Sequence, residues 1–408
     1  MMNTYWLYLE PYTFVFHNKQ KAVFYNTTNG EYLAYHYSDH EYLEDIVLKL
    51  DNPSNGYGTL ISEMEIKRMN SIIENLRDSF TGDCIPVDTE DNLPFIFKPL
   101  CRVMEDKISK MEHVGNGIGE NYAMEVLTNL NEVTLFLAPD KQECVQDSDY
   151  PYYHQFIHSL DYPCNTPLTL KEYSQLIAQL CNIGIGSLNL VLNESACDVF
   201  HEILPLLCEC ECKVNLYIND RDLKMLHSMA TPKHFQYIVN VHHLNQELLH
   251  DWMKNYKMFD IHWNFIVASE TDLQKASQWD DNVSILPYYN GSNNDFFENF
   301  VYSDLDTILN TQIDKQTIFR RQILNEEFFG KLFILSNGDV FSNMNAQPIG
   351  NIKNVSLAQI VYEELHSTTS WFKLREYGKC KDCVNKYLCP SISNYEWVIG
   401  KPDLCHIE

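Results

Sequence analysis

Between residues 130 and 300, short apolar strands alternate with helical stretches, and this alternation constrains the fold more than any other feature of the chain. Strands separated by helices are joined by right-handed crossovers, so their sheet is mostly parallel. Six such strands predict a partial barrel or an open doubly wound sheet, and the alternation alone does not choose between the two. The expected strands are 133–137, 188–192, 214–218, 237–241, 261–267 and 283–286.

The helix expected over residues 170–181 carries signals at both ends. Thr169 can cap its N-terminus, and Glu172 stands three residues later, as in a capping box. Gly184 can end the helix because glycine readily adopts the left-handed conformation of a helix C-terminus. Residues 131–324 are therefore expected to form one α/β domain.

The first part of the chain, residues 1–90, is expected to be a separate α+β module. Aromatic and aliphatic side chains alternate through residues 4–37, which predicts a β-meander, and Asn29-Gly30 is a strong signal for a tight turn. Two helices are expected after the meander, the second over residues 66–76. Residues 91–130 would connect this module to the α/β domain.

The pattern changes again in residues 325–408. A hairpin is expected over residues 331–341, turning at Asn337-Gly338, and a short helix over residues 357–365. A dense group of cysteines follows that helix. We therefore expect a third, small module at this end of the sequence.

The 408-residue chain is acidic, with 30 basic and 56 acidic side chains and a formal net charge of −26. So acidic a surface repels both nucleic acid and anionic lipid, and nucleic-acid binders need Lys and Arg to displace counterions. No apolar run approaches the ~18 residues of a transmembrane helix. Glu10 and Pro11 stand where the apolar core of a signal peptide would run. We expect a cytoplasmic protein with no nucleic-acid or membrane partner.

The chain has thirteen cysteines. In a reducing cytoplasm, closely clustered thiols indicate metal ligation or small buried side chains more than disulfides. Cys208, Cys210 and Cys212 alternate with glutamates near an expected helix end, and we interpret them as structural cysteines rather than a metal site. His242 and His243 follow a strand without a matched carboxylate or nucleophile, and we expect them to be solvated.

The last module contains the strongest chemical signal. Cys380, Cys383, Cys389 and Cys405 put four thiols within 26 residues. The loop that holds the first three is too short and polar to bury them as packing residues, so we expect metal binding. Four thiolates suit either a structural zinc ion or a [4Fe-4S] cluster. Because only Cys380 and Cys383 form the close pair typical of a zinc ribbon, the spacing favours the cluster, with zinc as the alternative.

The same region resembles the SPASM domain that follows many radical S-adenosylmethionine enzymes acting on ribosomally made peptides. The resemblance covers residues 325–408 and rests on residues 330–340, on Ile349-Gly350-Asn351-Ile352 and on the cysteine run. It implies that the four cysteines bind the second auxiliary [4Fe-4S] cluster of such domains. Ser393 and residues 341–344 lack the thiols that a first auxiliary cluster needs, so we expect that site to be lost.

Upstream, the alternating region resembles the partial (β/α)6 barrel of radical enzymes. Those enzymes carry C-x3-C-x2-C after the first barrel strand, because three thiolates leave one iron open for S-adenosylmethionine. Here the loop after residues 133–137 contains only Cys144 and Cys164, and nowhere do cysteine gaps of three and two follow each other. Residues 192–195 replace the usual Gly-Gly-Glu motif. We therefore expect neither bound S-adenosylmethionine nor radical chemistry.

This combination resembles the pseudo-radical-SAM proteins of peptide-modification systems in Bacteroidales. The N-terminal module is similar to the winged-helix element that binds leader peptides, in which the peptide adds a strand to a sheet edge beside a helix. The docking surface so implied includes Phe24, Tyr25, Ile66 and Ile73. Our leading hypothesis is a non-catalytic or catalytically degenerate scaffold that binds a precursor peptide or a partner maturation enzyme.

Two other interpretations stay open. In one, the chain is a peptide-modifying enzyme that uses S-adenosylmethionine or the auxiliary cluster without a radical triad. In the other, it is a zinc-stabilised protein-interaction domain. The sequence contains no Gly-rich phosphate loop, serine elbow or His-Glu-x-x-His motif that would support a further enzyme class.

Overall fold

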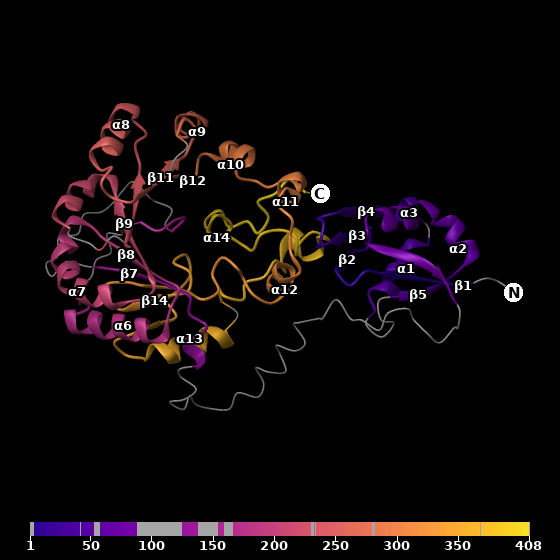
Figure 1. The fold of residues 1–408 in the computed structure, drawn as a ribbon, viewed down its shortest axis with the longest axis horizontal. Helices are drawn as coiled ribbons and strands as arrows, with labels where there is room; N and C mark the ends of the chain where they lie inside the picture. The colour runs from indigo at the N-terminus through magenta and orange to yellow at the C-terminus, as the bar shows by residue number, and fades with distance from the viewer. Residues whose placement is uncertain are drawn as a thin grey trace.

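The chain has a mixed α/β fold, built around one large sheet of nine strands and two small sheets of three. The large sheet has the order β12-β11-β10-β9-β8-β7-β13-β14-β15, and the small ones have the orders β5-β1-β6 and β2-β3-β4. In Figure 1 the large sheet lies at the left and the small sheets lie at the right. The computed structural model describes residues 4–40, 42–52, 58–87, 125–137, 154–158, 166–229, 232, 234–279, 282–367 and 369–407.

Six parallel strands follow one another in chain order within the large sheet, which confirms the predicted strands. They are β7 (Glu132–Phe136), β8 (Ser187–Val191), β9 (Lys213–Asn219), β10 (Gln236–Val241), β11 (Ile261–Val267) and β12 (Val283–Pro287). Each pairs in parallel with the next. On the other side of β7 the sheet continues through parallel β13 (Lys331–Ile334) and antiparallel β14 (Asp339–Phe341) and β15 (Gly350–Asn351).

Helices cover one face of this sheet. They include α6 (Leu170–Ile183), α7 (Cys197–Glu209), α8 (Gln246–Asn255) and α9 (Glu270–Ala276), which Figure 1 shows along the outside of the arc of strands. The α6 signals are confirmed: Thr169 and Glu172 form a capping box, and Gly184 is left-handed with φ of +69°. Because side chains alternate along a strand, Val133 and Leu135 of β7 enter the core beneath the helices.

The opposite face, which we call the inner face, carries rows of hydrogen-bonded polar side chains. The Asn189 amide donates to Glu132 at 2.8 Å, and the Asn215 amide donates to Asn189 at 2.8 Å. Farther along, the Asn264 amide donates to Asn240 at 3.0 Å, and the Asn240 amide donates to the carbonyl of Ile157 at 2.8 Å. The segment 154–158 therefore lies against the inner face of the strands.

The predicted N-terminal meander is only partly correct. Strands β2 (Thr13–His17), β3 (Lys21–Asn26) and β4 (Tyr32–His36) form it, whereas β1 (Thr4–Leu9) pairs with β5 (Gly58–Ser62) and β6 (Gly82–Pro86). The reason is that both faces of the β2–β3 pair are buried. Phe24 faces the core shared with Leu7 of β1, whereas Phe14 and Tyr25 face a second core on the other side.

The predicted helix over residues 66–76 is two helices. The N-terminal helices are α1 (Leu43–Leu50), α2 (Glu63–Arg68) and α3 (Asn70–Asp78). A capping box between Ser62 and Glu65 starts α2. Met69 is buried and its backbone leaves the helical conformation, with φ of −103° and ψ of 13°, so the two short helices meet at an angle there.

The second core joins the N-terminal module to the end of the chain. It combines Phe14 and Tyr25 with Ile318 of α12 and with Val384 and Leu388 of the cysteine loop. Helix α12 spans Lys315–Ile323. The Tyr25 hydroxyl accepts a hydrogen bond from the backbone N–H of Ile313 at 2.7 Å. The predicted modules therefore pack against each other across a continuous apolar contact.

The remaining helices lie around the C-terminal part of the chain. They are α10 (Asn294–Phe300), α11 (Leu305–Leu309), α13 (Leu357–His366) and α14 (Asn394–Ile399). The predicted hairpin and the helix after it are confirmed, and Gly338 takes φ of +91° at the turn. Among the helices of the described residues, none has the length and apolar character needed to cross a membrane.

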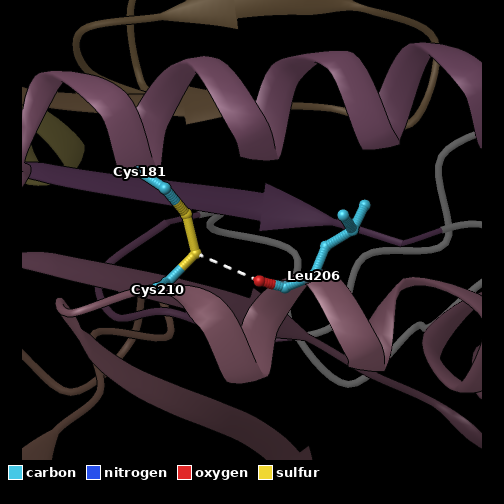
Figure 2. Close-up of a disulfide and its surroundings, with 3 residues drawn as sticks. All are labelled: Cys181, Leu206 and Cys210. Carbon is cyan, nitrogen blue, oxygen red and sulfur yellow. Dashed lines mark hydrogen bonds between the residues drawn. A yellow bond between two sulfur atoms is a disulfide. The ribbon is translucent and has the colours of Figure 1, made fainter.

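A disulfide joins Cys181 of α6 to Cys210 at the end of α7 (Figure 2). Their Cα atoms are 5.3 Å apart, within the usual range of about 4.4–6.8 Å. Cys210 is therefore structural, as expected, but through a disulfide that was not expected in a reducing cytoplasm, whereas Cys208 and Cys212 are free. The spacing did not reveal the pair because the partners are 29 residues apart and meet only when α6 packs beside α7.

Replacing Tyr25 by Phe should lower the free energy of unfolding by about 1–3 kcal/mol, because it leaves the buried N–H of Ile313 without its acceptor. Urea denaturation of the full chain measures the change. Tyr12→Phe, a half-buried tyrosine of the same module, is the control and should stay near the parent value. Equal losses in both variants would contradict the assigned hydrogen bond.

Candidate metal centre

The four cysteines of the predicted metal site come from two segments of the C-terminal module. Cys380 lies in a short 3-10 helix, Gly378–Asp382, and Cys383 directly follows it. Cys389 lies at the end of the turns that follow Cys383, and its N–H donates to the carbonyl of Asn385 at 2.9 Å. Cys405 belongs to the last segment, where it bridges to Ser303 in parallel.

The fold brings these four thiols within electrostatic reach of one another. Burial raises the pKa of Cys389 to about 12, and Cys383, Cys405 and Cys380 add to the rise. Burial likewise raises the pKa of Cys380, with contributions from Cys405 and Cys383. Among the described residues, no group of three or more His, Cys, Asp or Glu side chains is placed so that it could hold a metal ion. The thiols influence one another's charge, and metal binding by them stays a prediction.

Two of the sulfurs receive hydrogen bonds from nitrogen donors. The Cys383 sulfur accepts from the backbone N–H of Asn385 at 3.4 Å, and the Cys380 sulfur accepts from Nη1 of Arg375 at 3.8 Å. Such bonds stabilise negative charge on thiolate and are a common means of tuning iron–sulfur sites. Both bonds would favour the thiolate over the thiol at these two cysteines, and a metal group bound there would displace the thiol protons.

Arg375 ties the two cysteine segments together. Its Nε donates to the carbonyl of Pro390 at 2.6 Å, and its Nη1 donates to the carbonyl of Pro402 at 2.9 Å. Its Nη1 also donates to the Glu396 carboxylate at 2.6 Å. Burial opposes the charge of Arg375, but Glu396 and the thiols of Cys389 and Cys380 hold its pKa above the usual value. One guanidinium therefore connects Cys380 with Pro390, Glu396 and Pro402, which lie between Cys389 and Cys405.

Ser393, where the resemblance to SPASM domains would place a cysteine, has a structural role. It is the N-cap of α14, and it forms a capping box with Glu396. Its backbone N–H donates to the Glu396 carboxylate at 2.6 Å, so Glu396 holds both the helix start and Arg375. The serine therefore supports the site without supplying a ligand.

The residues predicted to bind a peptide lie mostly inside the protein. Phe24 and Ile73 are buried in the core of the N-terminal module, and Tyr25 is buried against the C-terminal module. Ile66 on α2 is half-buried. These positions hold the module together, and a role of theirs in peptide binding stays a prediction. Cys144 and Cys164, which bear on the missing radical motif, lie outside the described residues.

The structure also shows an interaction that sequence reasoning missed. His242 is not solvated: its Nδ1 lies 3.2 Å from Asp220 Oδ1, and its backbone N–H donates to Asp220 Oδ2 at 3.0 Å. Asp220 directly follows β9 and His242 directly follows β10, and these strands are parallel neighbours. Because both residues directly follow expected neighbouring parallel strands, the sequence already indicated that they could meet at the carboxyl edge of the sheet.

A scan against protein-family models found no match to this chain, and a search of curated proteins found no relative. The resemblances drawn from the sequence therefore stay proposals.

Replacing Arg375 by Met should lower the free energy of unfolding by about 3–5 kcal/mol, because it leaves the buried Glu396 carboxylate without its partner. The two side chains are only 14% and 5% exposed. Arg320→Met is the control, since that side chain is 47% exposed in its ion pair with Glu326 and should cost at most about 1 kcal/mol. Similar losses in both variants would contradict the linking role of Arg375.

Proposed function

We propose that this protein is a non-catalytic scaffold, related to radical S-adenosylmethionine enzymes, that binds a precursor peptide or its modifying enzyme during maturation of a ribosomally made peptide. The observation that supports the proposal is a set of four cysteines, Cys380, Cys383, Cys389 and Cys405, of which Cys380 accepts a hydrogen bond from the buried Arg375 and interacts electrostatically with the others. This set is retained in a sequence that lacks the three-cysteine motif of radical chemistry.

In this proposal the four cysteines hold one [4Fe-4S] cluster. The cluster would supply structural cross-links between the cysteine loop and the last segment of the chain, since each thiolate binds a different iron. The neighbouring residues favour such a role, because Val384 and Leu388 of the same loop pack on the N-terminal module. A cluster at this position would stabilise the cysteine loop against which the N-terminal module packs.

The cysteine loop and the N-terminal module are also joined by a chain of hydrogen bonds. The hydroxyl of Tyr32 on β4 donates to Asn385 Oδ1 at 2.9 Å, and the N–H of Asn385 donates to the Cys383 sulfur. Burial raises the pKa of Tyr32 to about 12, and the nearby thiols of Cys383 and Cys389 contribute to the rise. A metal group bound at these cysteines would therefore act on the N-terminal module, which we assign to peptide binding, through these hydrogen bonds.

Protein purified without oxygen should contain about four irons and four sulfides per chain. Cys383→Ala should lose most of the iron because it removes one ligand. Cys208→Ala, at an exposed free cysteine of α7, is the control and should keep the parent iron content. Iron, sulfide and zinc assays measure the result, and one zinc per chain without iron would replace the cluster by the zinc alternative.

We assign peptide docking to the edge strand β5 and to the start of α2. Strand β5 is at the end of its sheet, so its outer edge can accept an added strand. Leu60 on β5 and Met64 on α2 are exposed apolar side chains on either side of Ser62. They provide the apolar contacts beside a helix that strand addition needs, next to the half-buried Ile66.

Met64→Glu should weaken the binding of precursor peptides encoded beside this protein at least about tenfold, because it puts a charge into the apolar contact. The full-length chain is used, with fluorescence anisotropy of labelled peptides as the measurement. Met258→Glu is the control, since Met258 is 80% exposed in the loop between α8 and β11. If both variants bind as the parent does, the docking surface is not at β5.

A further inference from the structure

A cavity of about 130 Å³ lies at the inner face of the large sheet, beside β7 and β13. Its volume is close to that of the engineered cavity of about 150 Å³ that binds benzene, and below the ~300–1,000 Å³ of typical small-molecule sites. The cavity therefore has room for one amino-acid side chain or a molecule of similar size. The proposed metal centre does not include it, since none of the four cysteines lines it.

Two carboxylates, those of Glu132 and Glu327, and one basic side chain, Lys331, line the cavity. Glu132 begins β7 and is directly opposite Lys331 of β13 in the parallel register. Lys331 forms an ion pair with Glu327, and its Nζ lies 3.9 Å from Glu327 Oε1. Glu132 instead accepts a hydrogen bond from the amide of Asn189 at 2.8 Å. Among the described residues Glu132 forms no ion pair within 4.0 Å, although Lys331, which pairs with Glu327, lines the same cavity.

The rest of the lining is largely apolar and aromatic. Phe136 and Phe333 come from the two strands, Met344 from the segment after β14, and Phe156 from the segment along the inner face. His154 also lines the cavity, but burial lowers its pKa to about 3, so it is neutral and adds no positive charge. The walls thus combine aromatic faces, which attract cations, with two carboxylates and one ammonium group, and that ammonium group, Lys331, pairs with Glu327 rather than Glu132.

We propose that this cavity binds an alkylammonium group, with its apolar stem among Phe136, Phe333 and Met344 and its charged end at the Glu132 carboxylate. A neutral ligand would leave the negative charge of Glu132 unpaired, and an anion would be repelled by it. The acidity of the whole chain favours the approach of cations further. The inference goes beyond the scaffold role and does not depend on the metal.

Two sources can present this chemistry: the lysine side chain of a peptide and a free primary amine. Titration calorimetry of the full-length protein with Nα-acetyl-lysine methylamide and with n-butylammonium separates them. n-Butanol is the neutral probe of similar shape. At least one amine should bind about tenfold or more tightly than n-butanol, because it adds a charge-assisted hydrogen bond. The better of the two amines identifies the source.

Glu132→Gln tests the carboxylate itself. It should remove the preference for the amine over n-butanol, while the amide oxygen still accepts the hydrogen bond from Asn189 and the folded state is kept. Glu202→Gln, at an exposed position on α7, is the control and should bind like the parent. Phe333→Trp provides a second variant, since a larger ring fills the cavity and should block every probe.

Several results would overturn the proposal. They are equal binding of amine and n-butanol by the parent, an unchanged preference in Glu132→Gln, or no binding of either amine at millimolar concentration. None of these results would bear on iron content or on peptide binding at β5, so this inference and the proposed function fail separately.

Discussion

The buried ion pair between Arg375 and Glu396 is the interaction on which the C-terminal module depends. A charged group taken out of water is tolerated only when its hydrogen bonds are made, and Arg375 makes them to Pro390, to Pro402 and to the Cys380 sulfur. The carboxylate of Glu396 is in turn held by the capping box that starts α14. The positions of the cysteine segments therefore follow from one satisfied polar network rather than from an apolar core of their own.

This network connects with the rest of the molecule through two apolar contacts. The cysteine loop packs on the β2–β3 pair through Val384 and Leu388, and the large sheet packs on its helices through a separate core. The inner face of that sheet combines rows of hydrogen-bonded asparagines with a smaller apolar cluster that includes Phe136, Val191 and Phe333, and the segment 154–158 lies against it. One face of the sheet therefore packs under the helices in the main core, whereas the other mixes polar and apolar side chains and contains Glu132 and the cavity.

The features that could be predicted from the sequence are those with local signals. The six strands and α6 follow from alternation, periodicity and capping residues that lie within a few positions of one another. The pairing of β1 with β5, the disulfide of Cys181 and the role of Arg375 depend on residues far apart in the chain, so no local pattern indicates them. For the candidate site, the spacing selected four cysteines whose thiols interact electrostatically in the fold, while metal binding by them stays a prediction.

The double burial of the β2–β3 pair has a consequence for how the N-terminal module can be used. Because the β2–β3 pair contributes to two cores, the N-terminal module cannot rotate freely relative to the rest of the chain. A peptide bound at β5 would therefore keep a fixed distance and direction relative to the large sheet. In the proposed function, the module would then fix the length of peptide between its anchored end and any enzyme bound elsewhere. Removing the module would also expose Ile318, Val384 and Leu388, so a shortened chain would carry a new apolar surface that is prone to aggregation.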